Sequence, residues 1–388
     1  MREFMLVDIV KKCKEKKHAI IVGAGLVGKQ LYGVLKQQGC VVVEFWDNNS
    51  KEIKIDSVIV KIPYKMQDSH YMFIIAVRDL KSRNTLFNQL IELGINKENI
   101  VLYNDLSDSK FIEGLEESDY PEIINNLYFK VFEKEINFNN PSTYNEKINW
   151  EKLYLRDPIR TRLADKVEVR QWIREEIGER YLTKWYGVWD NAEEIDFDKL
   201  PPSFVLKANN GSGRNILVKD KSEINTSAVI SQLNEWKKQN YAFTALELQY
   251  KDILPKIICE EYLEGLAETV YDYNIYCFGG EPKYIWCIKG SHRPNCQASF
   301  YDLNWNMQPF SYGYPKDEIV APRPEKLDEM LELSRKLCKQ FNHVRVDWYN
   351  MPDGRVLFGE MTFTTWAGLR KFCPEEYDME FGKLIKGK

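Results

Sequence analysis

Two strand-like segments near the C-terminal end of this 388-residue chain place charged residues at alternating positions. The first carries Arg345 and Asp347, and after a turn the returning segment carries Glu360 and Thr362. Because side chains alternate along a strand, all four can project from one face of a hairpin. Carboxylate and hydroxyl oxygens on a rigid hairpin suit Mg²⁺, and an adjacent arginine stabilises a transferring phosphoryl group or an acyl phosphate. We predict that Asp347, Glu360 and Thr362 hold magnesium and that Arg345 is catalytic.

A second segment combines a lysine with a loop of glycine and small polar residues. The apolar run 204–206 ends at Lys207, and a further apolar run at 216–218 follows the loop. This pattern predicts a β-hairpin whose tip folds over a triphosphate and offers backbone N–H groups to it. It is not a P-loop, because no Gly-Lys-Ser/Thr sequence opens a helix. A hairpin turn without a ligand is the alternative. The candidate phosphate-binding residues of the tip are Asn210, Gly211, Ser212 and Gly213.

A third segment, 256–265, is an apolar strand that runs into acidic residues. Taken alone, it indicates only a strand end with surface acids. Beside a triphosphate loop it would instead act as a hinge in which one acid and the following backbone bind adenine, while a later acid binds ribose. The candidate residues are Glu260, Glu261, Tyr262, Leu263, Glu264 and Glu268.

The first hundred residues contain a dinucleotide-binding pattern. The apolar run 19–22 leads into Gly23, Gly25 and Gly28, and a helical segment and a second strand follow, ending at Asp47. In such a unit the glycines allow a tight turn, close approach of a phosphate and helix–strand packing, and the acid binds ribose. The ligand would be a nucleotide sugar or NAD. A Rossmann-like turn without a ligand is the alternative. Dehydrogenase chemistry is rejected, because a region of about 100 residues leaves no room for the substrate domain of a dehydrogenase.

Further apolar runs at 57–60, 72–77 and 100–102, with a helical pattern at 80–93, complete a small doubly wound parallel sheet. Acidic and polar residues then dominate 104–121. We therefore divide the chain into a Rossmann-like domain at 1–104, a linker and entry helix at 105–140, and a catalytic domain at 141–388. In the catalytic domain, Thr143 and Glu146 form a capping box, and 164–170 reads as a helix.

Composition limits the classes of function. The formal net charge of −4 and the isoelectric point near 5.8 exclude the basic footprint of a nucleic-acid-binding protein. No stretch is apolar enough to span a membrane, and no signal peptide is apparent. The 8 scattered cysteines form no Cys-x-x-Cys pair, so we expect buried free thiols in the reducing cytoplasm. The oligomeric state is open.

Together the three motifs resemble the ATP-grasp superfamily. A longer set of motifs narrows the resemblance to its family named for teichuronopeptide biosynthesis, the TupA-like family, over residues 125–385 or so. These motifs are Asn145-Glu146-Lys147, Arg156-Asp157-Pro158, Asp165-Lys166, Val169-Arg170, Gly187-Val188-Trp189, the run 204–207, Phe300-Tyr301-Asp302 and the run 358–364. The fold class that follows is α/β at the N-terminus and an α+β ATP-grasp fold at the C-terminus.

The resemblance also implies roles for individual residues. Lys166 and Lys207 would contact the phosphates of ATP, and Glu264 or Glu268 would bind its ribose. Thr362 stands where many ATP-grasp enzymes have asparagine, which leaves a second metal ion in doubt. Lys289 and Arg293 are further candidate catalytic residues.

The implied reaction is the ATP-dependent joining of a carboxylate and an amine through an acyl phosphate. The family context suggests a surface-polysaccharide precursor such as a uronic acid as the substrate. Two alternatives remain open at this point: a phosphotransferase acting on a sugar or glycan, and a non-catalytic nucleotide-binding scaffold of a glycan assembly complex. A glycosyltransferase is disfavoured because no Asp-x-Asp sequence lies in a strand context.

Overall fold

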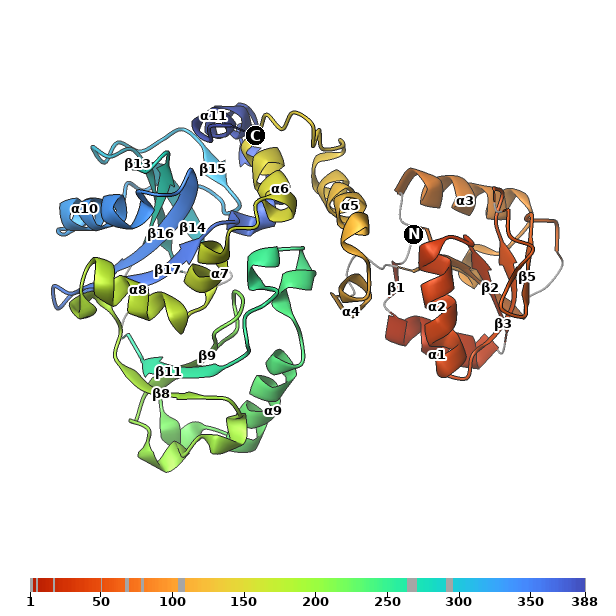
Figure 1. Cartoon of the computed structure of the whole chain (residues 1–388), viewed down its shortest axis with the longest axis horizontal. Helices are drawn as coiled ribbons and strands as arrows, with labels where there is room; N and C mark the ends of the chain where they lie inside the picture. The colour runs from red at the N-terminus through yellow and green to blue at the C-terminus, as the bar shows by residue number, and fades with distance from the viewer. Residues whose placement is uncertain are drawn as a thin grey trace. The chain divides into compact units, whose positions relative to one another are not determined.

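The structure is a computed structural model. It describes residues 3–4, 6–16, 18–49, 51–66, 70–77, 80–103, 109–263, 271–290 and 296–387. The chain forms two compact units, Met1–Lys130 and Val131–Lys388, which are shown in Figure 1 and are treated separately below. The division falls within the predicted linker and entry segment, in helix α5 (Tyr120–Phe132), which follows the short helix α4 (Ser109–Glu113).

The N-terminal unit is built on one twisted sheet with the strand order β1-β7-β6-β2-β3-β5-β4 in its described part. All neighbours pair in parallel except β4 and β5, which form an antiparallel edge. The strands are β1 (Glu3–Phe4), β2 (His18–Val22), β3 (Val41–Trp46), β4 (Lys54–Ile55), β5 (Val58–Lys61), β6 (Tyr71–Ile75) and β7 (Ile100–Tyr103). The predicted small doubly wound sheet is therefore confirmed, with an antiparallel edge strand added.

Helices cover both faces of this sheet, which is why its strands are apolar runs without alternation. Helices α1 (Leu6–Lys16) and α2 (Leu26–Gln37) pack with Ile21 and Ile74 in one core. Helix α3 (Leu80–Glu92) packs with Phe73 and Ile75 in the other.

The C-terminal unit contains two antiparallel sheets. The smaller has the order β10-β9-β11-β8, and the larger has the order β14-β13-β12-β16-β17. The strands of the smaller sheet are β8 (Trp185–Trp189), β9 (Phe204–Ala208), β10 (Asn215–Val218) and β11 (Ile257–Glu261). Those of the larger are β12 (Asp272–Phe278), β13 (Glu281–Lys289), β14 (Gln297–Tyr301), β16 (His343–Asn350) and β17 (Val356–Thr362). Strands β15 (Ser311–Tyr312) and β18 (Phe372–Cys373) form a separate pair.

The helices of this unit lie on the two faces of the larger sheet, except α9, which packs against the smaller sheet (Figure 1). They are α6 (Tyr144–Tyr154), α7 (Pro158–Ala164), α8 (Glu168–Glu176), α9 (Thr226–Lys237), α10 (Leu327–Cys338) and α11 (Glu376–Leu384). Helices α8 and α10 present apolar stripes to the face that bears Ile275 and Val346. Helices α6 and α11 pack with Tyr276 and Trp286 on the opposite face. That second face also carries Arg345 and Asp347 of β16. Helix α6 and these two charged residues therefore lie on the same side of the larger sheet.

Three local expectations have clear outcomes. The capping box at the start of α6 is confirmed, since the Thr143 hydroxyl accepts from the Glu146 N–H and the Glu146 carboxylate accepts from the Thr143 N–H. The predicted helix 164–170 is wrong: α7 ends before Asp165, whose carboxylate accepts from the N–H of Val167, and α8 begins only after that turn. The described cysteines are unpaired and buried with the exception of Cys373, which is exposed.

None of the helices in the described part of the chain combines the length and the apolar character that a membrane span needs.

The buried His343 predicts a specific acid sensitivity. Burial, reinforced by the charges of Arg160 and Arg345, lowers its pKa to about 3. The unfolded chain protonates this histidine below about pH 6.5, so between these two values the unfolded state binds more protons. The stability that His343 contributes as a neutral group is therefore complete above pH 6.5 and is lost as the pH falls toward 3.

We expect His343→Gln to flatten this acid limb. The variant should lose some stability at every pH, because it removes the imidazole ring that packs against Tyr144 and Phe278 and whose Nε2 atom lies 3.1 Å from the Tyr144 hydroxyl. Its additional loss of unfolding free energy between pH 8 and pH 5 should be smaller than that of the wild type by about 2 kcal/mol. Urea titrations at a series of pH values measure this difference, and parallel curves for the two proteins would contradict it.

Candidate active site

The β16–β17 hairpin brings the predicted reaction residues together. Arg345 lies opposite Thr362 in the register, and an irregularity in the pairing occurs beside Asp347. There the chain bulges at Gly359, where a Cβ would lie 3.1 Å from the Asp347 carbonyl oxygen. The close approach that glycine permits carries the next residue, Glu360, alongside the other three side chains.

A single guanidinium group joins the acids of this hairpin. Arg345 donates from Nε to Asp347 Oδ1 at 2.7 Å and from a terminal nitrogen to Asp347 Oδ2 at 2.5 Å. The same terminal nitrogen donates to Glu360 Oε1 at 3.2 Å, and the Thr362 hydroxyl donates to that oxygen at 2.9 Å. Arg345 and Asp347 are each only 8% exposed. Such a buried, multidentate pair fixes the side chains that the sequence places on one face.

Burial sets the protonation of these acids. Desolvation raises the pKa of Asp347 to about 7, with the Glu360 charge adding to the rise and Arg345 opposing it. For Glu360, burial alone would raise the pKa, but the charges of Lys166 and Arg345 outweigh it and lower the pKa below its ordinary value. The two carboxylates therefore need cations nearby to be ionised together.

The cations come from segments outside the hairpin. Lys166 lies in the turn between α7 and α8, where its ammonium group donates to the Gly211 carbonyl at 2.5 Å. Lys207, on β9, forms an ion pair with Glu260 on β11 at 2.8 Å. Both lysines lower the pKa of Glu360. The structure therefore brings both predicted phosphate-binding lysines within electrostatic range of Glu360, a predicted metal-binding acid of the larger sheet.

The β9–β10 hairpin has the predicted glycine tip. Gly211 has φ +112° and Gly213 has φ +73°, both in the region that favours glycine. A Cβ on Gly211 would lie 2.5 Å from the Tyr241 ring, whereas a Cβ on Gly213 would meet nothing within 4 Å. Ser212 is exposed at the tip, and the buried Asn210 Oδ1 atom has no hydrogen-bond partner among the described residues.

The predicted adenine hinge lies at the end of β11. Glu260 is buried and pairs with the half-buried Lys207. Glu261 accepts from the Lys184 N–H at 2.9 Å and from Arg355 at 3.1 Å. Tyr262 and Leu263 follow as the first residues after the strand. Glu264, Glu268 and Arg293 lie outside the described residues.

One predicted catalytic residue is not brought to this cluster. Lys289 is exposed at the end of β13, where strand alternation places it on the face of Ile285 and Cys287, opposite to that of Trp286.

Three residues beside the cluster were not among the predicted site residues. Asn274 lies opposite both Asp347 and Trp286 in the register, and Tyr276 lies opposite Arg345. The Arg345 guanidinium also lies 5.9 Å from the centre of the Trp286 ring. The alternation of polar and aromatic residues along β12 could have indicated that these residues share one face. The sequence does not show which strands pair with β12, so it could not place them beside Arg345 and Asp347.

The oxygen atoms of this hairpin suit a magnesium ion. Asp347 and Glu360 both contact one Arg345 nitrogen, so their carboxylates are close enough to share a single cation. Hard oxygen ligands of this number, completed by phosphate oxygens and water, are what Mg²⁺ prefers. Within the described ranges, no cluster of three or more His, Cys, Asp or Glu side chains forms a metal site made by protein ligands alone.

In the glycine loop of the N-terminal unit, Gly23 and Gly28 have the tight turn and the close helix–strand packing that the motif predicts. A Cβ on Gly28 would lie 1.9 Å from the Gly23 carbonyl oxygen, and Gly23 itself has φ +113°. Gly25, the N-cap of α2, has open space at its Cβ position. Asp47 accepts a hydrogen bond from the Ala24 N–H at 2.7 Å, so it closes the loop beside that open space.

Comparison with known families decides the classification. Residues 146–386 match the family described as TupA-like ATP-grasp. The chain belongs to the TupA-like ATP-grasp family. This chain is accordingly an enzyme of the ATP-grasp ligase class, and ATP-dependent ligation of a carboxylate to an amine is its general activity.

Solved structures that are similar to this TupA-like ligase have low sequence identity and low TM-scores. An L-amino acid ligase from Bacillus licheniformis has 10% identity and a TM-score of 0.38, over 95% of this chain and 74% of that one. A D-alanine–D-alanine ligase from Bacillus anthracis, solved with ATP, has 15% identity and a TM-score of 0.34, over 95% and 94%. No match was found among curated proteins. The assignment therefore depends on the family match.

The glycine tip offers a matched pair of variants. Gly211→Ala should weaken ATP binding by about tenfold or more, because both the positive φ and the Tyr241 ring oppose a Cβ there, and strain of roughly 1–3 kcal/mol shifts the loop. Gly213→Ala introduces no steric overlap and should have a smaller effect. Titration of each variant with an ATP analogue measures this, and equal losses for the two variants would contradict the assigned role of Gly211.

Proposed function

We propose that this TupA-like ligase phosphorylates the carboxylate of a surface-polysaccharide precursor, such as a uronic acid, and joins it to an amine in the cytoplasm. The observation that supports this is the buried cluster of Arg345, Asp347 and Glu360, within electrostatic range of Lys166 and Lys207. A cluster of this kind is suited to holding ATP and an anionic carboxylate substrate together.

The proposed reaction has two steps. A carboxylate oxygen attacks the γ-phosphorus of ATP, and the bond to ADP breaks to give an acyl phosphate. The amine nitrogen then attacks the acyl carbon, inorganic phosphate leaves, and the nitrogen loses a proton as the amide forms. Arg345 stabilises the negative charge of the acyl phosphate, and Lys166 and Lys207 bind the phosphate oxygens of ATP.

Magnesium is part of this proposal. Asp347 and Glu360 would hold it, with Thr362 as a further oxygen ligand, and the ion would screen the charge of the phosphate oxygens. The protein's own contribution is to place cations near both acids, which favours their ionised forms, and to fix the two acids on one hairpin.

We further propose that the N-terminal unit binds a nucleotide sugar or a related nucleotide such as NAD. The support is the uncapped N-terminus of α2 beside the open space at Gly25, because helix N-termini favour phosphate groups. This unit would then deliver or position the sugar for the ligase.

The two acids of the hairpin provide the principal test of the catalytic proposal. Asp347→Asn and Glu360→Gln should each reduce ATP-dependent ADP release at least about a thousandfold, because each removes a negative charge that would hold the magnesium ion of the bound triphosphate. Asp353→Asn is the matched control: it lies in the turn of the same hairpin, where it pairs with the exposed Arg355, and it should retain wild-type rates. Rates are measured with uronic acids and a panel of amines, and amide products are identified by mass spectrometry. Wild-type turnover in both acid variants would overturn the metal assignment.

The nucleotide proposal for the N-terminal unit can be tested separately. Gly25→Asp places a negative charge where the phosphate would lie, at a position whose Cβ atom would meet no described atom within 4 Å, and should abolish calorimetric binding of UDP-sugars or NAD to the full chain. Gly33→Asp, on the same helix and equally free of contacts, should leave that binding intact. Failure of the wild-type protein to bind either kind of nucleotide would end this proposal.

A further inference from the structure

The two lysines that we propose for the phosphates of ATP repel each other and belong to different segments. Lys166 lies in the turn between α7 and α8, and Lys207 lies on β9. Burial lowers the pKa of Lys166, and the charge of Lys207 adds to this shift. A site of this kind needs contacts that keep the turn and the β9–β10 hairpin together before a triphosphate neutralises the two cations.

Three described hydrogen bonds join this turn to the hairpin. The Lys166 ammonium group donates to the Gly211 carbonyl at 2.5 Å, and the Lys166 N–H donates to the Asn209 carbonyl at 3.2 Å. The Asn209 side-chain amide donates to Asp165 Oδ1 at 2.9 Å. A triphosphate competes for the ammonium group alone, so the two bonds of Asn209 are the ones that can hold the turn in place when ATP is bound.

The side chain of Asn209 also reaches a third segment. Asn209 follows the last residue of β9 and is fully buried, at 0% exposed. Its Nδ2 atom donates to the Leu254 carbonyl at 3.0 Å, and its Oδ1 atom accepts from the Lys256 N–H at 2.7 Å. Its own N–H donates to the Lys256 carbonyl at 3.1 Å. Asn209 therefore links the turn before α8, the end of β9 and the segment that leads into β11.

These partners fix the orientation of the Asn209 amide. The ionised Asp165 carboxylate and the Leu254 carbonyl only accept hydrogen bonds, and the Lys256 N–H only donates one. Both amide N–H groups and one lone pair of the amide oxygen are thus used. Leucine has nearly the same shape and offers none of these bonds, so its presence would leave buried polar groups without partners.

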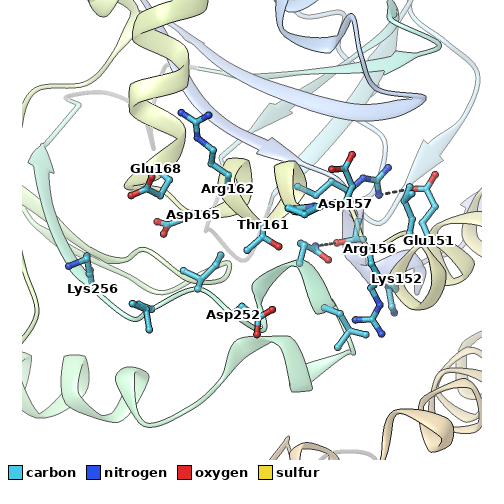
Figure 2. A pocket seen from close by; sticks show the side chains of 18 residues that line it. Glu151, Lys152, Arg156, Asp157, Thr161, Arg162, Asp165, Glu168, Asp252 and Lys256 are labelled. Carbon is cyan, nitrogen blue, oxygen red and sulfur yellow. Dashed lines mark hydrogen bonds and ion pairs between the residues drawn. The ribbon is translucent and has the colours of Figure 1, made fainter.

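Asp165 connects the same contact to the backbone of the turn. Its Oδ1 atom also accepts from the Val167 N–H at 2.8 Å, across the turn in which Lys166 is the middle residue. Burial raises the pKa of Asp165, and the hydrogen bonds from Val167 and Asn209 oppose the rise. Figure 2 shows Asp165 and Lys256 in the wall of one cavity of about 590 Å³, each on a segment that Asn209 joins. A displacement of Asp165 would displace Lys166 with it.

Both bonded residues lie next to a phosphate-binding lysine along the chain. Asp165 immediately precedes Lys166, and Asn209 is the second residue after Lys207. The bonds between Asn209 and Lys256 continue the β9–β11 ladder beyond its last paired residues. A change at Asn209 would therefore reach Lys166 through the turn and Lys207 through the strand.

We propose that the Asp165–Asn209 hydrogen bond is a brace that preorganises the triphosphate site, because it holds the Lys166 turn beside Lys207 before ATP binds. The free energy needed to bring two ammonium groups together is then supplied by folding and is not subtracted from the binding of ATP. Asp165 and Asn209 are positioning residues that act through the two lysines. The inference rests on the proposed roles of Lys166 and Lys207 in binding the phosphates of ATP.

The phosphate dependence of ligand binding tests this brace. Equilibrium dialysis of the full chain with magnesium would measure the affinities of a non-hydrolysable ATP analogue and of adenosine, which has no phosphate to contact the lysines. Asn209→Leu should bind the ATP analogue about tenfold more weakly or worse, and adenosine within about twofold of the wild type. An unchanged affinity for the ATP analogue, or an equal loss for analogue and adenosine in a folded variant, would overturn the inference.

Asn342→Leu is the matched control for this substitution. The Asn342 amide likewise bonds both backbone groups of a distant residue, because it donates to the Lys386 carbonyl and accepts from the Lys386 N–H. It joins no segment that carries a phosphate-binding lysine. The variant should bind both ligands as the wild type does, and a loss of analogue affinity equal to that of Asn209→Leu would count against the brace.

Two substitutions of Asp165 separate its hydrogen bond from its charge. Asp165→Asn keeps an oxygen acceptor for Asn209 and Val167 and loses the charge, whereas Asp165→Leu loses both. Asp165→Asn should bind the ATP analogue within about threefold of the wild type, and Asp165→Leu about tenfold more weakly or worse. Equal affinities of the two variants, reduced or not, would contradict the brace. This comparison also decides the case in which Asn209→Leu does not fold.

The lysines separate this inference from the proposed function. Lys166→Met and Lys207→Met should each weaken binding of the ATP analogue about tenfold or more, because each removes a cation from the phosphates. If both lysine variants lose affinity while Asn209→Leu and Asp165→Leu do not, the brace is wrong and the lysine assignment stands. If both lysine variants bind the analogue as the wild type does, the proposed phosphate-binding role of the lysines is itself wrong.

Discussion

The arrangement of the C-terminal unit depends on one buried interaction, in which the Arg345 guanidinium holds Asp347 and Glu360 together. Burial raises the pKa of Asp347 to about 7, and the charge of Glu360 on the neighbouring strand adds to this rise. The hairpin tolerates the pair because cations surround it. An active site for ATP has the same requirement, since triphosphate and acyl phosphate add further negative charge to an already acidic hairpin.

This constraint explains why the smaller sheet must face the larger one. The lysines that lower the pKa of Glu360 do not belong to its own sheet: Lys207 lies on β9, and Lys166 lies in the turn between α7 and α8. Lys166 is fixed there by the Gly211 carbonyl at the tip of the β9–β10 hairpin. Movement of that hairpin would therefore change the position of a phosphate-binding cation and the electrostatics of the acids at the same time.

A second pair of buried charges follows the same principle with a different outcome. Arg345 and Asp347 meet in a bidentate contact, whereas Lys152 and Glu247 are each satisfied by neutral groups and remain apart.

The sequence by itself determined the chemistry that is local in the chain. Alternation along two short strands was enough to place Arg345, Asp347, Glu360 and Thr362 on one hairpin, and the glycine spacing was enough to predict the first βαβ unit of the doubly wound sheet. These predictions succeed because hairpin geometry and helix capping depend on residues only a few positions apart. The same local reasoning failed at 164–170, where the Asp165 side chain ends one helix and begins a turn instead of continuing it.

Only the tertiary structure decided which distant residues meet. The register of β12 against β16 sets Asn274 beside Asp347, and the packing of α6 against the loop after β17 brings Lys152 near Glu247. The tertiary structure also separates Lys289 from the cluster, because Lys289 lies on the opposite face of β13 from Trp286. No periodicity in the chain encodes these pairings, because they result from the way whole elements pack. The electrostatics of a buried site depend on that packing, since desolvation and charge proximity arise only once the segments are assembled.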